Sequence, residues 1–87
     1  MIKIIGLSIA GPTLINLIFS DGTRASWDAA DIIARDTVMT RPLSDPASFA
    51  RAFNESGALA WPNGLEFSAR GLQARLVASG KLVRMAA

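Results

Sequence analysis

The stretch Phe19-Ser20-Asp21-Gly22-Thr23 joins two apolar segments, and Trp61-Pro62-Asn63-Gly64-Leu65 repeats its pattern later in the chain. Each stretch reads as an aromatic residue, a turn former, Asp or Asn, Gly and a strand residue. Asp-Gly and Asn-Gly favour a two-residue hairpin loop, but that loop would split the large apolar residues between the two faces. A three-residue loop, in which a left-handed glycine forms a bulge, gathers them on one face. We therefore predict two bulged hairpins.

This loop sets the register of both hairpins. It also places Pro62 at the first central turn position, which suits the fixed φ of proline. The predicted strand partners are Phe19 with Thr23, Leu17 with Ala25, Ile15 with Trp27, Trp61 with Leu65, and Leu59 with Phe67.

Composition limits the class of protein. The chain has 87 residues, of which 51% are hydrophobic and 18% charged, with a net charge of +2. These values predict one α+β domain over residues 1–87, built from antiparallel curved β-hairpins packed against two or three short helices. The chain has no Cys and no His, which excludes disulfides, thiolate metal sites and histidine-based catalysis. We expect a cytoplasmic, non-catalytic protein without a cofactor.

Several other elements follow from local patterns. The first ten residues weakly resemble a secretion signal, but a strand buried on both faces is the favoured interpretation, and no run is long enough to span a membrane. Val38 and Met39 are expected to reach the core. The predicted elements are strands at Ile2–Ile9, Thr13–Phe19 and Thr23–Trp27, a helix at Ala29–Asp36 capped by Asp28, a helix from Pro46 capped by Asp45, strands ending at Glu55, Trp61 and Phe67, and a helix at Ala69–Ser79 capped by Ser68.

Two segments keep alternatives open. Phe53 lies four residues after Phe49, so it shares a helical face with Phe49 or opens the next strand. The tail, residues 81–87, forms an edge strand, continues the last helix or contacts a second subunit.

Candidate sites are few. The acids Asp21, Asp28, Asp31 and Asp45 are assigned to turns and helix starts, although Asp28 and Asp31 could also ligate a hard metal ion. Trp27 and Trp61 are expected in the core; if either were exposed beside Arg24 or Arg41, it would be an anchor for a partner. A small-molecule pocket near Trp61, Arg41 and Asp28 is the enzyme or receptor alternative.

The charge distribution is uneven. Four basic residues and no acid lie between Ser68 and Ala87, whereas residues 21–36 carry more acids than bases. This basic surface is a candidate contact for nucleic acid, for an acidic protein or for the acidic part of a second copy, and it is also what an ordinary solvated helix shows. Its four basic residues are Arg70, Arg75, Lys81 and Arg84.

The chain resembles the small bacterial family called domain of unknown function 2442 over about residues 2–72. The resemblance rests on the two aromatic-turn-glycine stretches, Asp28, Arg41-Pro42-Leu43, Asp45-Pro46 and Phe49. It implies a bacterial α+β domain that occurs alone or fused ahead of a helix-turn-helix domain, often encoded beside toxin–antitoxin-like partners. This chain differs in its longer basic helix and tail, and it is too short to include the fused domain.

We therefore expect a protein-interaction module that is homodimeric and acts as an antitoxin-like or regulatory partner of a protein encoded nearby. Direct nucleic-acid binding through the four basic residues is the first alternative, and a small-molecule site is the second.

Overall fold

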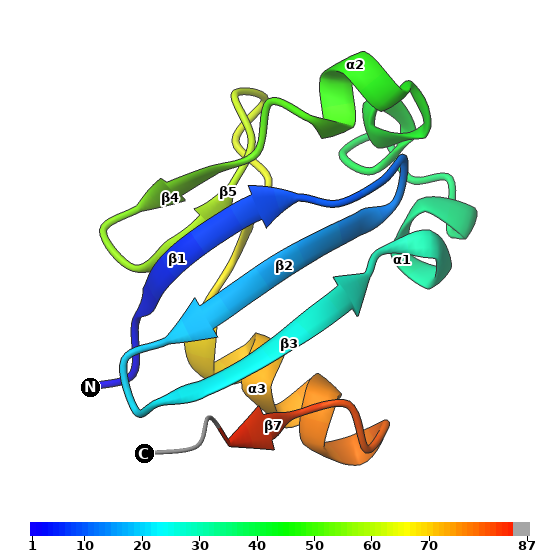
Figure 1. The fold of residues 1–87 in the computed structure, drawn as a ribbon. Coiled ribbons are helices and arrows are strands. Elements are labelled where there is room, and N and C mark those ends of the chain that lie inside the picture. Colours follow the sequence, from blue (N-terminus) through cyan, green and yellow to red (C-terminus); the bar gives the residue numbers. More distant parts are fainter. Residues whose placement is uncertain (85–87) are drawn as a thin grey trace.

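The computed structural model describes residues 1–84, which form two antiparallel sheets and several short helices. The larger sheet has the strand order β1-β2-β3-β7, and the smaller one has the order β4-β5-β6 (Figure 1). The elements in chain order are β1 (Ile4–Ile9), β2 (Leu14–Phe19), β3 (Thr23–Asp28), α1 (Ala30–Ala34), the 3₁₀ turn η1 (Arg41–Ser44), α2 (Pro46–Phe49), β4 (Phe53–Glu55), β5 (Ala58–Ala60), β6 (Glu66–Phe67), α3 (Ala69–Ala78) and β7 (Val83–Arg84).

The first hairpin has the predicted bulged loop. Ile15 pairs with Trp27 and Leu17 with Ala25. The Gly22 N–H donates to the carbonyl of Phe19 at 3.1 Å, and the φ of Gly22 is +84°. A left-handed backbone of this kind is strained for residues with a Cβ, which explains the glycine.

The second hairpin repeats this geometry. The Gly64 N–H donates to the carbonyl of Trp61 at 3.0 Å, and the φ of Gly64 is +93°. Leu59 pairs with Phe67, as the bulged register predicts. Both organising turns are therefore confirmed in type and register.

Two of the three predicted N-caps are confirmed, at Asp45 and Ser68, whereas the N-cap of the first helix is Ala29 and not Asp28. The Asp45 carboxylate accepts from the Ala47 N–H, and the Ser68 hydroxyl accepts from the Gly71 N–H. Helix α1 starts at Ala30, one residue later than predicted, and ends earlier, at Ala34. The Asp28 carboxylate still accepts from the N–H of Ala30 at 2.9 Å, so Asp28 stabilises this helix start.

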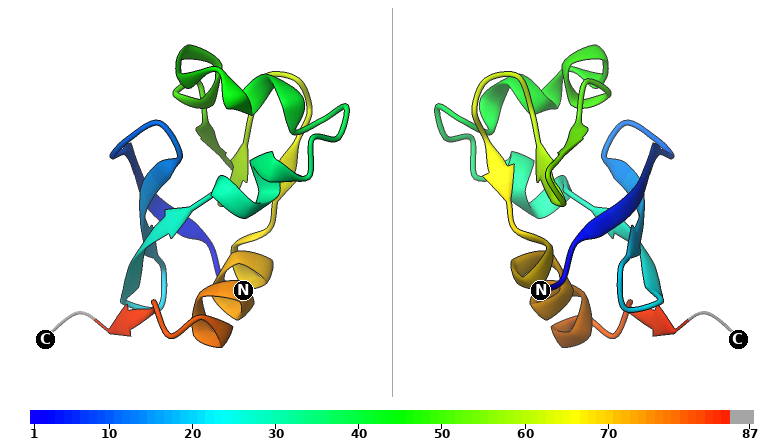
Figure 2. Two further views of the ribbon diagram at one scale, coloured as in Figure 1. Left: turned by 90° about the vertical axis from the view of Figure 1, so that its right-hand side faces the viewer. Right: turned by 90° about the vertical axis from the view of Figure 1, so that its left-hand side faces the viewer.

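One core lies between the two sheets and the helices. Figure 2 shows the four-stranded sheet on one side of the molecule and the helices and smaller sheet on the other, so one face of the larger sheet is uncovered. An aromatic cluster joins the layers: the Phe67 ring lies 5.5 Å from that of Trp27 in the larger sheet and 6.1 Å from that of Trp61, which lies 5.9 Å from that of Phe49. The largest fully buried side chains are Phe19, Phe49, Ile4, Ile15, Leu17, Leu43, Leu59 and Leu72.

The prediction that the first strand is buried on both faces is wrong. The strand begins at Ile4 rather than Ile2, and Ile5 and Ile9 are 63% and 37% exposed. The reason is topological: β1 is an edge strand of the larger sheet, and one face of that sheet has no covering layer.

The prediction that Val38 and Met39 reach the core is also wrong. Val38 is 81% exposed and Met39 is partly exposed. The side chains of Thr37 and Thr40 hydrogen-bond each other at 2.9 Å and also accept from each other's backbone N–H groups. This local bonding closes the turn and buries Thr40 instead of its two apolar neighbours.

Both open alternatives are resolved for the described residues. Phe53 opens β4 and does not continue helix α2. The tail forms an edge strand, in which Val83 pairs with Arg24 and Arg84 with Thr23. Residues 85–87 of the predicted tail lie outside the described residues.

Candidate functional site

Trp61 and Arg41 were predicted as possible partner-binding residues in addition to the four basic residues near the C-terminus. The structure places these two residues in different environments. Trp61 is 2% exposed, and its indole N–H donates to the carbonyl of Phe49 at 2.9 Å, so it belongs to the core. Arg41 is exposed and forms an ion pair with Asp36 at 2.9 Å. Asp28 lines the cavity described below, but neither Trp61 nor Arg41 does.

The four basic residues near the C-terminus do not form one patch. The Arg75 guanidinium lies 5.9 Å from the centre of the Phe67 ring, and Arg84 donates to the carbonyl of Asp21 at 3.2 Å. Lys81 and Arg75 line a common cavity, whereas Arg70 and Arg84 do not line it. Two of the four predicted basic residues, Arg75 and Lys81, therefore lie at one site.

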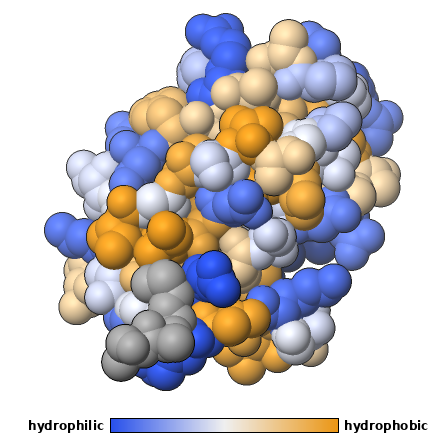
Figure 3. Space-filling view, in the orientation of Figure 1, coloured by the Kyte–Doolittle hydropathy of each residue, from blue (hydrophilic) through white to orange (hydrophobic). Residues whose placement is uncertain are grey.

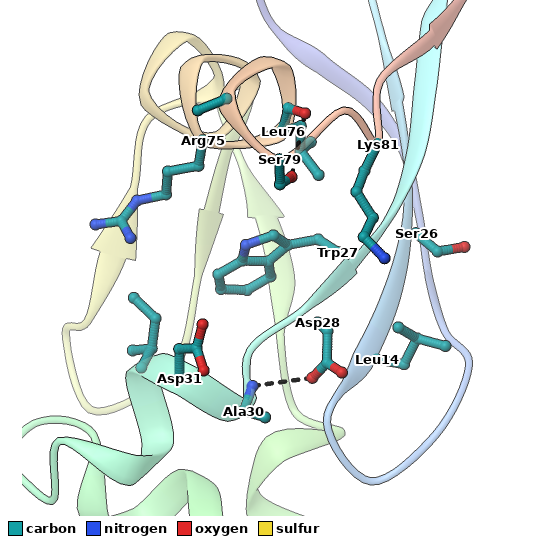
Figure 4. Close-up of a pocket in the computed structure, with 12 residues that line it drawn as sticks. Leu14, Ser26, Trp27, Asp28, Ala30, Asp31, Arg75, Leu76, Ser79 and Lys81 are labelled. Carbon is teal, nitrogen blue, oxygen red and sulfur yellow. Dashed lines mark hydrogen bonds between the residues drawn. The ribbon is translucent and has the colours of Figure 1, made fainter.

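That cavity lies between the end of β3, the start of α1 and the end of α3. We call it the Trp27 cavity; its volume is about 710 Å³. Asp28 and Asp31 approach it from the side of α1, and Arg75 and Lys81 approach it from α3 and the segment that follows (Figure 4). Its apolar wall is made by Leu14, Ile32 and Leu76 together with the Trp27 ring.

The charges around the Trp27 cavity are not neutralised by one another. Among residues 1–84 the structure contains one ion pair, between Arg41 and Asp36, so the cavity acids and bases lie more than 4.0 Å apart. One carboxylate oxygen of Asp28 accepts from the N–H of Ala30. Within the described chain, no three acidic side chains lie close enough to hold a metal ion, so the pair Asp28 and Asp31 gains no further ligand.

A second hollow lies on the uncovered face of the larger sheet. Its volume is about 650 Å³, and its lining includes Asn16, Ile18, Arg24, Lys81 and Val83. Figure 3 looks onto this face and shows hydrophobic and hydrophilic side chains interspersed. Antiparallel sheets commonly leave one face in water, so this mixture fits a solvated surface.

The outer edge of β1 is the third surface. The Ala10 N–H donates to the carbonyl of Leu14 at 2.8 Å, which sets the phase of the β1–β2 ladder. Because bonded and non-bonded pairs alternate in an antiparallel ladder, the N–H and C=O groups of Leu7 and Ile9 point away from β2. Within residues 1–84 these groups have no strand beside them.

The first turn is held by a polar network. The Thr23 hydroxyl donates to the Asp21 carboxylate at 2.6 Å, and the Gln73 side-chain amide donates to the same carboxylate at 3.0 Å. These bonds, that of Thr23 first, lower the pKa of Asp21 below its ordinary value of 3.8. Asp21 therefore serves the turn, as predicted.

Comparisons with protein-family models, with curated proteins and with solved structures find no match. The resemblance to domain of unknown function 2442 therefore stays a prediction. None of the helices among residues 1–84 has the length and apolar character needed to cross a membrane.

Sequence reasoning missed two of these surfaces. The Trp27 cavity combines residues that lie some fifty positions apart in sequence, and no local pattern links Asp31 to Arg75 or Lys81. The β1 edge had a signal: the run from Ile4 to Ile9 has no charged residue and no proline, which is typical of strands that are paired on both sides.

Proposed function

We propose that the chain is a non-catalytic protein-interaction module of the bacterial cytoplasm that pairs with a second copy of itself along β1. The observation that carries this proposal is the outer edge of β1, where Leu7 and Ile9 each present an N–H and a C=O group that have no partner among residues 1–84. Such an edge is a ready template for another strand.

The edge lacks the features by which natural sheets prevent pairing. Between Ile4 and Ile9 there is no charged residue and no proline. A bulge lies between Ile4 and Gly6, but it protects the first half of the strand only. In that half the N–H of Ile4 already donates to the carbonyl of Gly57, and its carbonyl accepts from the Asn54 side chain. The second half is left open.

The arrangement in space also favours access to this edge. In Figure 2 the end of the larger sheet that holds the β1–β2 turn leans away from the smaller sheet and the helices. Ile5 and Ile9 are exposed beside the edge, so a paired strand would cover apolar surface as well as backbone groups.

A second copy fits this edge better than an unrelated partner of opposite charge. Two β1 strands related by a two-fold axis would run antiparallel, with Leu7 of each copy opposite Ile9 of the other, and both copies would use the same residues. The strand contains no charge, so this pairing brings no like charges together. A small domain also gains stability from the added buried surface.

Nucleic-acid binding has less support. Proteins that bind single strands stack bases on exposed aromatic rings beside basic residues. In the described chain, both tryptophans, Phe19 and Phe49 are buried, and Arg75 and Arg84 already contact Phe67 and Asp21. Phe53 is 40% exposed, but it lies on β4, outside the basic segment. A regulatory role toward a protein encoded nearby rests on the family resemblance alone.

Hydrogen exchange of the full chain tests the proposal at residue level. We expect the amide protons of Leu7 and Ile9 to become more protected as the protein concentration rises, because the dimer pairs them. The amide of Ser8 points to β2 and is the internal control. Fast exchange of Leu7 and Ile9 at every concentration, with Ser8 protected throughout, would contradict pairing along β1.

A further inference from the structure

The two tryptophans differ in the state of their indole N–H groups. That of Trp61 is bonded to Phe49, whereas that of Trp27 has no acceptor among residues 1–84, although Trp27 is only 5% exposed. No side-chain nitrogen or oxygen of the described residues is both fully buried and unpartnered, so the Trp27 N–H keeps some exposure, and Trp27 lines the cavity. A buried indole usually finds an acceptor, and here a ligand can supply one.

The second observation concerns the backbone beside this ring. The Ala29 N–H donates to the carbonyl of Thr13 at 2.8 Å, which sets the phase of the β2–β3 ladder. The N–H and C=O groups of Ser26 and Asp28 therefore point away from β2, toward the Trp27 cavity.

Within residues 1–84, no strand covers this part of β3. In the described residues β7 pairs with Thr23 and Arg24 alone. The chain before β7 turns away, because the Lys81 N–H donates to the carbonyl of Leu76 at 2.9 Å. The gap left between this segment and β3 is the Trp27 cavity.

The third observation is the charge along this gap. Asp28 and Asp31 lie at the end nearest α1, and Lys81 lies at the opposite end, where β7 begins (Figure 4). A peptide strand placed beside Ser26 and Asp28, on the same side of β3 as β7, would run antiparallel to β3, as β7 does. Its amino end would then lie beside the two carboxylates and its carboxyl end beside Lys81.

We propose that the Trp27 cavity binds a short peptide with free termini, extended and antiparallel to β3. The peptide adds to the sheet through the backbone groups of Ser26 and Asp28, which are separated by about 7 Å, so about three residues fit. A peptide carbonyl accepts from the Trp27 indole N–H.

The preferred side chain at the middle position of this peptide follows from the alternation of side chains between the two faces of a strand. The residue opposite Trp27 points to the same face of the sheet as Trp27 itself. There it meets Leu76 and Ile32, so an apolar side chain is favoured at the middle position. This site is independent of the pairing along β1, since β1 forms the opposite edge of the same sheet.

The test is an NMR titration of the full chain with the tripeptide Ala-Leu-Ala. We expect shifts of the Trp27 indole N–H and of the Ser26 and Asp28 backbone amides, with the Trp61 indole N–H unchanged as the internal reference. Ala-Asp-Ala, and Ala-Leu-Ala with both termini blocked, are expected to bind more weakly. No shift at Trp27 with Ala-Leu-Ala would overturn the proposal. Equal shifts with free leucine would show that the cavity binds single amino acids, and would overturn the proposal that it binds a peptide.

Two variants test the charge arrangement. Lys81→Gln and Asp31→Asn are each expected to weaken binding by up to about fivefold, the upper limit for a solvent-exposed ion pair. Asp28 is left unchanged because it supports the start of α1. Lys3→Gln, which removes the same charge from a residue outside the cavity lining, is expected to leave the affinity unchanged. Equal losses in Lys81→Gln and Lys3→Gln, with Asp31→Asn changing the affinity in the opposite direction, would show that net charge, rather than this site, controls binding, and would overturn the assigned orientation.

Discussion

The side-chain amide of Gln73 donates to the carboxylate of Asp21 at 3.0 Å and to the hydroxyl of Thr23 at 3.0 Å. These bonds join the last helix to the first turn across 52 positions of sequence. Arg84 adds a bond to the carbonyl of Asp21 from β7. The turn that sets the first hairpin therefore also positions β7 and α3, and the end of α3 lines the Trp27 cavity.

This network predicts a pH effect at Asp21. Its pKa in the folded protein is lowered, chiefly by Thr23 and then by Gln73. The ionised form is thus favoured in the folded state, and the resulting stability is present above the ordinary pKa of 3.8 and lost as the pH falls through the lowered value. In Gln73→Ala the pKa of Asp21 should move up toward 3.8, as read by NMR titration of its carboxyl group. An unchanged pKa would show that Gln73 does not contact Asp21 in solution.

The two tryptophans predict unequal costs for the same substitution. Trp61→Phe removes a buried hydrogen bond and leaves the Phe49 carbonyl without its donor, so the free energy of unfolding should fall by about 1–3 kcal/mol from this bond in addition to the lost ring volume. Trp27→Phe removes an N–H group that has no partner in residues 1–84 and should cost less. Urea unfolding of both variants measures the difference, and an equal or reversed order would contradict the assignment of the two indoles.

The glycines of the bulged turns predict a third effect. Gly22→Ala and Gly64→Ala should each lower the free energy of unfolding by about 1 kcal/mol, because both glycines have a positive φ. At Gly22 no atom lies within 4 Å of an added Cβ, so the cost comes from backbone strain and not from a clash. Gly11→Ala is the control: its φ is not positive, and its new Cβ would meet Leu14 at an ordinary 3.6 Å. Unchanged melting of all three variants would contradict the left-handed turns.

Much of the fold could be predicted because its determinants are local. The bulged register follows from the requirement that Ile15, Leu17 and Trp27 share a face, and the structure has these pairs. The caps at Asp45 and Ser68 depend only on a side chain two or three residues from the amide that it accepts from. Such features need no knowledge of distant contacts.

The remaining features depend on how the elements meet. Ile5 and Ile9 have the composition of a buried strand, but their exposure depends on which strand lies beside β1, and composition does not determine strand order. The Trp27 cavity likewise requires the end of α3 to lie across from α1, an arrangement that involves the contact of Gln73 with Asp21. A pocket near Trp61 was the sequence-based alternative because Trp61 and Arg41 are conspicuous residue types, yet Trp61 is in the core.

Light scattering on a size-exclusion column tests self-pairing along β1 most directly, using the full chain, Ile9→Lys and Ile18→Lys. Ile9 and Ile18 are both 37% exposed, but Ile9 lies at the outer edge of the sheet and Ile18 on β2, within its uncovered face. We expect the unchanged chain and Ile18→Lys to have twice the 9.2 kDa of one chain, and Ile9→Lys to be a monomer, because a lysine on an edge strand opposes pairing. A monomer for the unchanged chain, or a dimer that Ile18→Lys disrupts and Ile9→Lys does not, would contradict the account.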